Sequence, residues 1–242
     1  MMLTLLTFPG SDGLPSHSPF CVKAMGLLIL SGQRWNVEYV HDLATMPLGR
    51  VPVLRADGRL IPDSHHIQAH LESLGAEFNP GLTPQDRARS HMLIRMVEEN
   101  LRMGLVHDRW LHPDVWPILS QIFFAPVPDP GRAEIAAQAR DQVQAGLISH
   151  GIAQFDEADR LARMEHDLNA LTLTLGDRPY LFGARPTAAD AATVPVLDMI
   201  LRLPAPTGLR ALAQARPSLQ AYVTRARAVL YPTKLDLAPQ AA

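Results

Sequence analysis

Two short groups of residues have the chemistry to hold a peptide-like ligand. In Val51-Pro52-Val53, Pro52 cannot donate a backbone hydrogen bond, so it belongs at the first residue or the edge of a strand and leaves an edge open beside it. Asp63-Ser64 supplies side-chain oxygens that can cap a helix beginning at Ser64. The free N–H groups and the positive end of that helix dipole favour a carboxylate. A peptide-like ligand could therefore be held at this edge.

The single cysteine, Cys21, lies three residues after Ser18 at the predicted start of a helix. The spacing is that of a Cys-x-x-Cys motif whose first position is serine, so the thiol pair needed for disulfide reduction is missing. Helical geometry places Cys21 one turn inside Ser18, which favours a packed thiol, while a monothiol function through Cys21 stays open. One cysteine excludes an intramolecular disulfide and a Cys-rich zinc site.

Two further patterns favour structure over chemistry. His66 and His70, with His65 beside them, share a predicted helix face, but no third ligand has a plausible spacing, so we expect no metal site. Thr187-Ala188-Ala189-Asp190 has the spacing of a capping box, with Asp in place of Glu or Gln. We expect Thr187 and Asp190 to start a central helix and to order the core around it.

The elements that must position these residues follow from the hydrophobic pattern of residues 1–75. Asp57-Gly58 between two apolar runs predicts a β-hairpin, because Gly tolerates the positive φ that two-residue turns require. The order β-α-β-β-β-α indicates a small α/β layer structure with a right-handed first crossover. The predicted segments are a strand at residues 3–8, a helix at 20–30 with Ser18 as its N-cap, a strand at 36–40, the hairpin, and a helix at 64–74.

The remainder of the chain is predicted to be helical. Residues 77–87 form a linker that contains Asn79-Pro80-Gly81 and Pro84. We therefore expect an α/β domain at residues 1–76 and an all-helical domain at residues 88–242, ending in a frayed tail at 235–242. The predicted helices are residues 85–108, 133–148, 157–175, 188–201 and 217–229.

Composition excludes several classes of protein. The chain has 242 residues, of which 47% are hydrophobic and 19% charged, as in ordinary globular proteins. A net charge of −2 with scattered Lys and Arg gives no field for nucleic acid or an anionic membrane. No run approaches the roughly 20 apolar residues that span a bilayer, and residues 1–8 are too short and lack the basic region of a signal peptide. We expect a cytoplasmic protein.

Four groups of residues follow one another in an order typical of a known superfamily. They are Ser18-Pro19-Phe20-Cys21, Gly49-Arg50-Val51-Pro52-Val53-Leu54, Ile61-Pro62-Asp63-Ser64, and Tyr180-Leu181-Phe182-Gly183 with Pro186-Thr187-Ala188-Ala189-Asp190-Ala191. The chain resembles the glutathione transferase superfamily in these groups, and most closely its bacterial branch related to failed-axon-connections and metaxin proteins. The resemblance covers nearly the whole chain and implies a thioredoxin-like N-terminal domain followed by an all-helical C-terminal domain.

The resemblance also implies roles for particular residues. Val51-Pro52 would be cis, and the Val51 backbone would pair with the cysteine of glutathione, as in β-strand addition. Ser64 and its helix N-terminus would take the γ-glutamyl carboxylate, with Asp63 near the amino group. Arg50 would meet the glycyl carboxylate, although a lone Arg in such a loop is equally typical of a solvated surface charge.

Ser18 is the candidate that lowers the pKa of the glutathione thiol. A thiol with a pKa of about 8.5 is only a few per cent thiolate at neutral pH, and lowering it by two units requires about 2.7 kcal/mol. One hydroxyl hydrogen bond to the sulfur, about 1.5–3 kcal/mol, together with a helix N-terminus, up to about 2 kcal/mol, suffices without a metal. Ser16 or Ser11 of the same loop could donate instead, and Ser18 could serve as the N-cap alone.

The leading hypothesis is an enzyme, a cytoplasmic and homodimeric glutathione transferase that directs glutathione at an apolar electrophile. Glutathione would be its co-substrate, with no metal and with neither nucleic acid nor membrane as partner. An electrophile pocket between the domains would be lined by residues 85–108 and 110–124. A narrower version is glutathione-dependent ether cleavage or dehalogenation. The alternative is a non-catalytic glutathione-binding or scaffold protein on the same fold, in the manner of metaxin.

Overall fold

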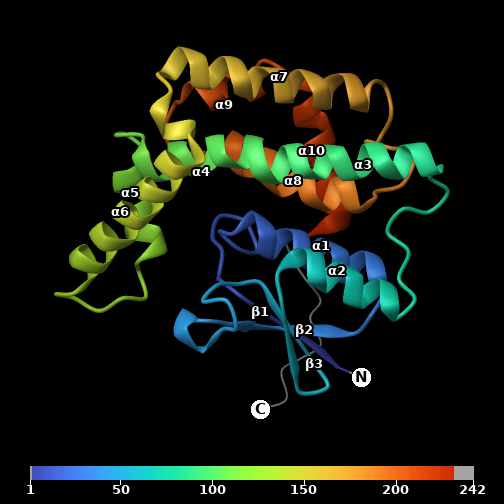
Figure 1. The fold of residues 1–242 in the computed structure, drawn as a ribbon, viewed down its shortest axis with the longest axis horizontal. Coiled ribbons are helices and arrows are strands. Elements are labelled where there is room, and N and C mark those ends of the chain that lie inside the picture. The colour runs from blue at the N-terminus through green and yellow to red at the C-terminus, as the bar shows by residue number, and fades with distance from the viewer. Residues whose placement is uncertain (1, 232–242) are drawn as a thin grey trace. The chain divides into compact units, whose positions relative to one another are not determined.

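The computed structural model describes residues 2–231 (Figure 1). The tail predicted at residues 235–242 lies outside the described residues. The described chain divides into two compact units, one made of residues 2–90, 178–195 and 224–231, the other of His91–Asp177 and Val196–Val223. The residues predicted to bind glutathione or to activate its sulfur all belong to the first unit, whereas most of residues 85–124, the predicted lining of the electrophile pocket, belong to the second.

The first unit is built on a four-stranded sheet with the strand order β2-β1-β3-β4. β1 (Leu3–Thr7) pairs in parallel with β2 (Trp35–Tyr39) and antiparallel with β3 (Val53–Ala56). β3 pairs in turn with β4 (Arg59–Pro62) across the turn Asp57-Gly58, whose φ values of 47° and 76° are both positive. This confirms the predicted hairpin, and it places β1 and β3, the most apolar strands, in the middle of the sheet.

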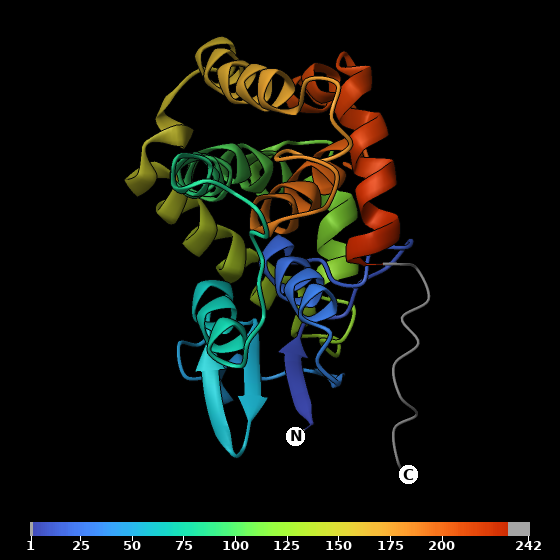
Figure 2. The same ribbon diagram turned by 90° about the vertical axis from the view of Figure 1, so that its right-hand side faces the viewer.

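Two helices pack side by side against this sheet (Figure 2). α1 (Pro19–Ser31) begins behind the N-cap Ser18 and ends at Gly32, and α2 (Ser64–Ser73) begins behind Asp63. All of residues 21–28 are buried in α1, as expected of a helix that is apolar all round. A Cβ at Gly26 would lie 3.6 Å from Leu230 and 3.7 Å from Ala191, so later segments of the chain cover this helix within the same unit.

The rest of the described chain is helical, and one predicted helix differs in detail. Residues 85–108 form α3 (Pro84–Met96) and α4 (Arg102–Leu111), separated by the π-helical turn η2 (Val97–Leu101). No helix among residues 2–231 has the length and apolar character needed to cross a membrane. The other elements are η1 (Leu43–Thr45), α5 (Trp116–Phe123), α6 (Arg132–His150), η3 (Ile152–Gln154), α7 (Glu157–Leu175), α8 (Ala188–Leu201), α9 (Gly208–Gln214) and α10 (Pro217–Leu230).

A buried carboxylate fixes the start of α8. Asp190 is 0% exposed, and its Oδ1 accepts the N–H of Leu181 at 3.0 Å. Its Oδ2 accepts both the N–H of Thr187 at 2.7 Å and the Thr187 hydroxyl at 2.8 Å. The carboxylate therefore satisfies donors from the preceding loop and from Thr187, the residue directly before the helix, at once.

Replacing this carboxylate should be costly. Asp190→Ala leaves buried donors unpaired, and we expect a loss of about 3–5 kcal/mol in the free energy of unfolding, measured by urea denaturation. Asp156→Ala is the matched control, because Asp156 caps α7 through the N–H of Asp159 at 2.9 Å but is exposed. Asp156→Ala should lower the free energy of unfolding by about 1 kcal/mol. Equal losses in the two variants would contradict a special role for the buried cap.

Candidate functional site

The site is built where β3 begins. The β1–β3 ladder stops at the pair Leu6 and Val53, directly after Pro52, and the Val51-Pro52 bond is cis, as the resemblance implied. The N–H of Asp63 donates to the Pro52 carbonyl at 3.1 Å. Neither the N–H nor the C=O of Val51 has a hydrogen-bond partner within residues 2–231. One backbone donor and one acceptor are thus left unpaired at the end of the strand.

This arrangement corrects the expected position of the open edge. The sequence places Pro52 at a strand's first residue or at an edge, and the structure shows it next to the first residue of an interior strand. β1 on one side and β4 on the other occupy the flanks of β3 from Val53 onward. The unpaired positions therefore lie at the end of the strand and not along an edge of the sheet.

Asp63 and Ser64 mark the start of α2. Asp63 Oδ1 accepts the N–H of His65 at 2.9 Å, and the Asp63 backbone has φ 75° and ψ 137°. Glycine enters such a region readily, whereas any other residue is strained there by about 1–3 kcal/mol. Ser64 is 2% exposed, and among the described residues neither its N–H nor its hydroxyl has a hydrogen-bond partner. A strained cap and an unpaired serine thus stand together at a helix N-terminus.

The three serines of the loop before α1 differ in their surroundings. Ser18 is the N-cap, is only partly buried, and its Oγ accepts the N–H of Cys21 at 3.4 Å. Ser16 is 0% exposed, and its Oγ accepts the N–H of Ser18 at 3.2 Å. The Ser11 hydroxyl lies 3.3 Å from the carboxylate of Asp12 on the surface. Ser18 alone combines partial exposure with a place at a helix N-terminus.

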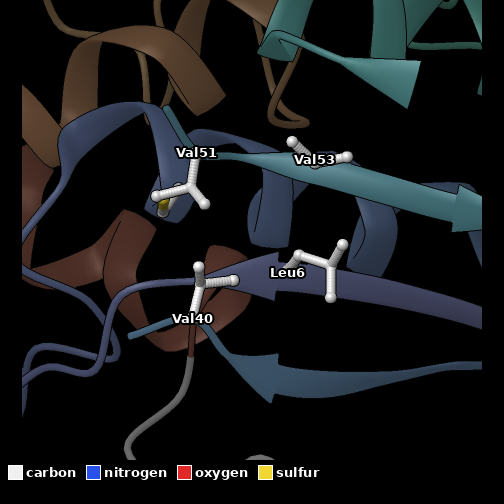
Figure 3. Close-up of a cluster of buried hydrophobic side chains, with 5 residues drawn as sticks. Leu6, Val40, Val51 and Val53 are labelled. Carbon is white, nitrogen blue, oxygen red and sulfur yellow. The ribbon is translucent and has the colours of Figure 1, made fainter. Parts of the chain in front are cut away.

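Cys21 is completely buried and packs in an apolar cluster. Its side chain shares this cluster with Leu6, Val40, Val51 and Val53, and Figure 3 shows the side chains of Val51 and Val40 directed toward each other. Burial raises the pKa of the Cys21 thiol, and the hydroxyls of nearby Thr7 and Ser18 offset part of this increase. A buried thiol with a raised pKa stays neutral, which favours the packed role over a nucleophilic one.

Cys21 therefore joins two parts of the site. Its N–H is bonded to the hydroxyl of Ser18, while its side chain belongs to the same buried cluster as that of Val51. Pro52 follows Val51 and is bonded through its carbonyl to Asp63. Two hydrogen bonds and one buried cluster thus link Ser18, Cys21, the cis peptide bond and the start of α2.

Other residues singled out from the sequence do not take part in these contacts. Arg50 is exposed, and within residues 2–231 its guanidinium forms no hydrogen bond or ion pair. His66 Nδ1 lies 3.1 Å from the Pro62 carbonyl. No group of three His, Cys, Asp or Glu side chains that could hold a metal ion occurs in the described part of the chain.

One residue near the site has no signal in the sequence. Thr7 ends β1, is 0% exposed, and its Oγ1 lies 3.4 Å from Ser16 Oγ. A threonine in an apolar strand is typical of any half-buried sheet, so its residue type alone does not indicate a place near the site.

Comparison with known proteins identifies similar domains and similar chains. The glutathione S-transferase N-terminal domain matches residues 19–115, and the glutathione S-transferase C-terminal domain matches residues 164–226. Isoprene-epoxide–glutathione S-transferase of Rhodococcus sp. (strain AD45) is 24% identical over 234 residues, covering 93% of this chain and 98% of that protein. Metaxin-1 of Macaca fascicularis is 24% identical over 241 residues, covering 95% of this chain and 75% of that protein.

Solved structures agree with these matches at the level of the fold. The beta-etherase LigF from Sphingobium sp. strain SYK-6 superposes with a TM-score of 0.66 at 18% identity, covering 94% of this chain and 96% of that one. The expected architecture of a thioredoxin-like N-terminal domain followed by a helical C-terminal domain is confirmed. The expected resemblance to metaxin proteins is confirmed as well.

The strained backbone at Asp63 can be tested by stability alone. Asp63→Ala should lower the free energy of unfolding by about 1 kcal/mol, because the cap is lost and the strain remains. Asp63→Gly should be more stable than Asp63→Ala by about 1–2 kcal/mol, because glycine relieves the strain. Asp42 is the control, since its Oδ1 accepts the N–H of Ala44 at the same 2.9 Å while its φ is −116°. If Asp42→Gly is more stable than Asp42→Ala by the same amount, backbone strain at Asp63 is refuted.

The raised pKa of Cys21 predicts a pH dependence of stability. Above the pKa of an unfolded thiol, about 8.5, the unfolded chain loses a proton that the folded chain keeps. The free energy of unfolding should therefore fall as pH rises, by up to about 1.4 kcal/mol per pH unit for this group. Urea denaturation of the unmodified protein and of Cys21→Ala between about pH 7 and pH 10 isolates this part of the slope. If the free energies of unfolding of the two proteins change with pH in parallel, Cys21 ionises as easily in the folded chain as in the unfolded one.

Proposed function

The chain belongs to the glutathione S-transferase superfamily, and we propose that it is a transferase that binds glutathione on its N-terminal domain and directs the thiolate at an apolar electrophile. The observation that carries this proposal is the set of unpaired polar groups at the start of β3 and α2. These are the N–H and C=O of Val51 and the N–H and hydroxyl of Ser64. Val51 and Ser64 are 7% and 2% exposed, and most polar groups of buried residues are paired, so these unpaired groups favour a ligand.

The tripeptide fits these groups by its own chemistry. The cysteine residue of glutathione would pair its backbone with that of Val51, as a short strand added beside the residues that lead into β3. Its γ-glutamyl carboxylate would accept from the N–H and hydroxyl of Ser64, at the positive end of the α2 dipole. Asp63 uses Oδ1 for the N–H of His65 and would offer its other oxygen to the amino group. The exposed guanidinium of Arg50 would meet the glycyl carboxylate.

Ser18 would act on the sulfur. Its oxygen accepts the N–H of Cys21, so its hydrogen can be directed at a ligand thiolate. The thiol proton would leave to water, and the thiolate would attack an electrophilic carbon, forming a C–S bond as the bond to the leaving group breaks. The neutral, buried Cys21 has no part in this transfer.

The class of electrophile is narrowed by one relative. The Rhodococcus protein is named for an epoxide, and it covers nearly the whole of this chain. We infer that an apolar epoxide is the first substrate to test, in which the C–O bond of the ring opens and the oxygen takes a proton from water. Cleavage of an aryl ether or of a carbon–halogen bond is the narrower alternative, and product analysis would identify each.

The two domains would bind different substrates. Glutathione would occupy the domain at residues 1–76, joined by the linker 77–87 to the helical domain at residues 88–242 that takes the second substrate. We infer that the protein works as a homodimer in the cytoplasm, without a metal.

A non-catalytic role on the same fold is the second candidate. Metaxin-1 matches as much of this chain as the Rhodococcus transferase and at the same identity. A metaxin-like scaffold that keeps glutathione would bind it without turning over any thiol acceptor. The unpaired groups at Val51 and Ser64 favour binding under both candidates, so turnover decides between them.

The experiment is titration calorimetry with glutathione and with S-methylglutathione, whose methylated sulfur cannot form a thiolate. Asp63→Asn keeps the helix cap but removes the charge. It should lower the affinity for both ligands about tenfold, because a charge-assisted hydrogen bond contributes about 1.5–3 kcal/mol. Ser18→Ala should leave S-methylglutathione unaffected and raise the pKa of the bound glutathione thiol by about one to two units.

Several results would refute the assignment. No binding of glutathione by the unmodified protein removes the proposed function. An unchanged thiol pKa in Ser18→Ala, with a shift in Ser11→Ala, would move the sulfur-activating role to Ser11. Binding and ionisation without turnover of an epoxide, an aryl ether or an alkyl halide would favour the scaffold.

A further inference from the structure

Ser18 is held by a group of buried hydroxyls. Ser16 and Thr7 are both 0% exposed. Ser16 Oγ accepts the N–H of Ser18 at 3.2 Å, and Thr7 Oγ1 lies 3.4 Å from Ser16 Oγ and 3.1 Å from the Phe8 carbonyl. The hydroxyls of Thr7, Ser16 and Ser18 all lie within reach of the Cys21 thiol. A hydroxyl buried without a hydrogen bond is costly, so each of these contacts resists displacement.

The loop that carries Ser16 has little freedom to move. A Cβ at Gly10 would lie 2.0 Å from the Leu14 carbonyl oxygen and 2.6 Å from the Ser16 nitrogen, so the loop crosses directly over this glycine. The N–H of His17 donates to the Pro9 carbonyl at 3.1 Å, which closes the loop onto the end of β1. Ser16 is thereby fixed relative to Thr7, the last residue of that strand.

We propose that Ser16, supported by Thr7, is a positioning residue that sets the direction of the Ser18 hydroxyl toward the sulfur of bound glutathione. The inference rests on the proposed function. The bond from the Ser18 N–H to Ser16 fixes the peptide plane that precedes Ser18, and hence the direction of its Cα–Cβ bond. A hydrogen bond to a thiolate weakens steeply with misalignment, so a small displacement of Ser18 reduces ionisation of the thiol.

The arrangement also removes Ser16 from the set of sulfur donors. Its oxygen accepts from the Ser18 N–H, and the residue has no exposed surface through which to meet a ligand. Ser16 therefore acts on the sulfur only through Ser18. Loss of its hydroxyl should change the ionisation of the thiol while leaving the binding groups at Val51 and Ser64 in place.

The test compares Ser16→Ala with Ser31→Ala. Ser31 lies at the other end of α1, and its Oγ accepts the N–H of Gln33 at 3.2 Å, the same i to i+2 geometry and distance as between Ser16 and Ser18. Thr7→Val and Thr7→Ser form a second pair, in which only the second keeps the hydroxyl. Each variant is titrated with glutathione while the thiolate is followed by ultraviolet absorbance, and with S-methylglutathione by calorimetry.

We expect Ser16→Ala to raise the pKa of bound glutathione by about half to one unit, a three- to tenfold loss of thiolate below that pKa. Affinity for S-methylglutathione should stay within about twofold, since the binding groups are untouched. Thr7→Val should shift the pKa in the same direction, Thr7→Ser should restore it, and Ser31→Ala should leave it unchanged. A merely structural role would lower stability without moving the pKa.

The outcomes separate this inference from the function on which it rests. If the unmodified protein ionises bound glutathione but neither Ser16→Ala nor Thr7→Val shifts the pKa, the positioning role is wrong and the transferase remains. An equal shift in Ser31→Ala would also overturn it, as a general loss of stability. If the unmodified protein binds no glutathione, the positioning role and the proposed transferase function are both refuted. Should Ser16→Ala fail to fold, the two variants of Thr7 decide alone.

Discussion

The hydrogen bond from the Asp63 N–H to the Pro52 carbonyl is the constraint on which the site depends. It continues the register of the β3–β4 hairpin, in which Val53 lies opposite Pro62, by one further position. A slip of one residue would turn every side chain of the hairpin to the other face of the sheet and separate these groups. The two-residue turn at Asp57-Gly58 therefore determines, from several residues away, which backbone and side-chain groups meet at the site.

Near this hydrogen bond, apolar side chains pack into one cluster and hydroxyl groups form a separate set of hydrogen bonds. The cluster of Leu6, Val40, Val51, Val53 and Cys21 anchors the cis dipeptide by burial. The hydroxyls of Ser16 and Ser18 accept the N–H groups of Ser18 and Cys21 at the start of α1, and the Thr7 hydroxyl lies 3.4 Å from that of Ser16. The Cys21 thiol suits a position between the two groups, because a neutral thiol is apolar enough for the cluster and still accepts weak hydrogen bonds.

Local chemistry made much of this region predictable. Asp57-Gly58 indicates its turn because both residues tolerate positive φ, and Ser18 with Pro19 marks the start of α1. The interior position of β3 could not be read from the sequence, since it depends on β1 inserting between β2 and β3 from a distant part of the chain. The strain at Asp63 was hidden for a related reason, because an Asp before a helix is an ordinary cap in any extended conformation. The π-helical turn at Val97–Leu101 likewise interrupts a run whose hydrophobic period is that of a plain α-helix.

The close packing of Gly26 has a consequence for the autonomy of the N-terminal domain. A Cβ there would meet Leu230 at the end of α10 and Ala191 in the first turn of α8, so both segments cover α1 inside the same compact unit. Residues 1–76 taken alone would leave that apolar flank of α1 in water, and exposed apolar surface of this kind promotes association. The compact unit that carries the candidate site is thus completed by the last helix of the described chain, so residues 1–76 do not form it by themselves.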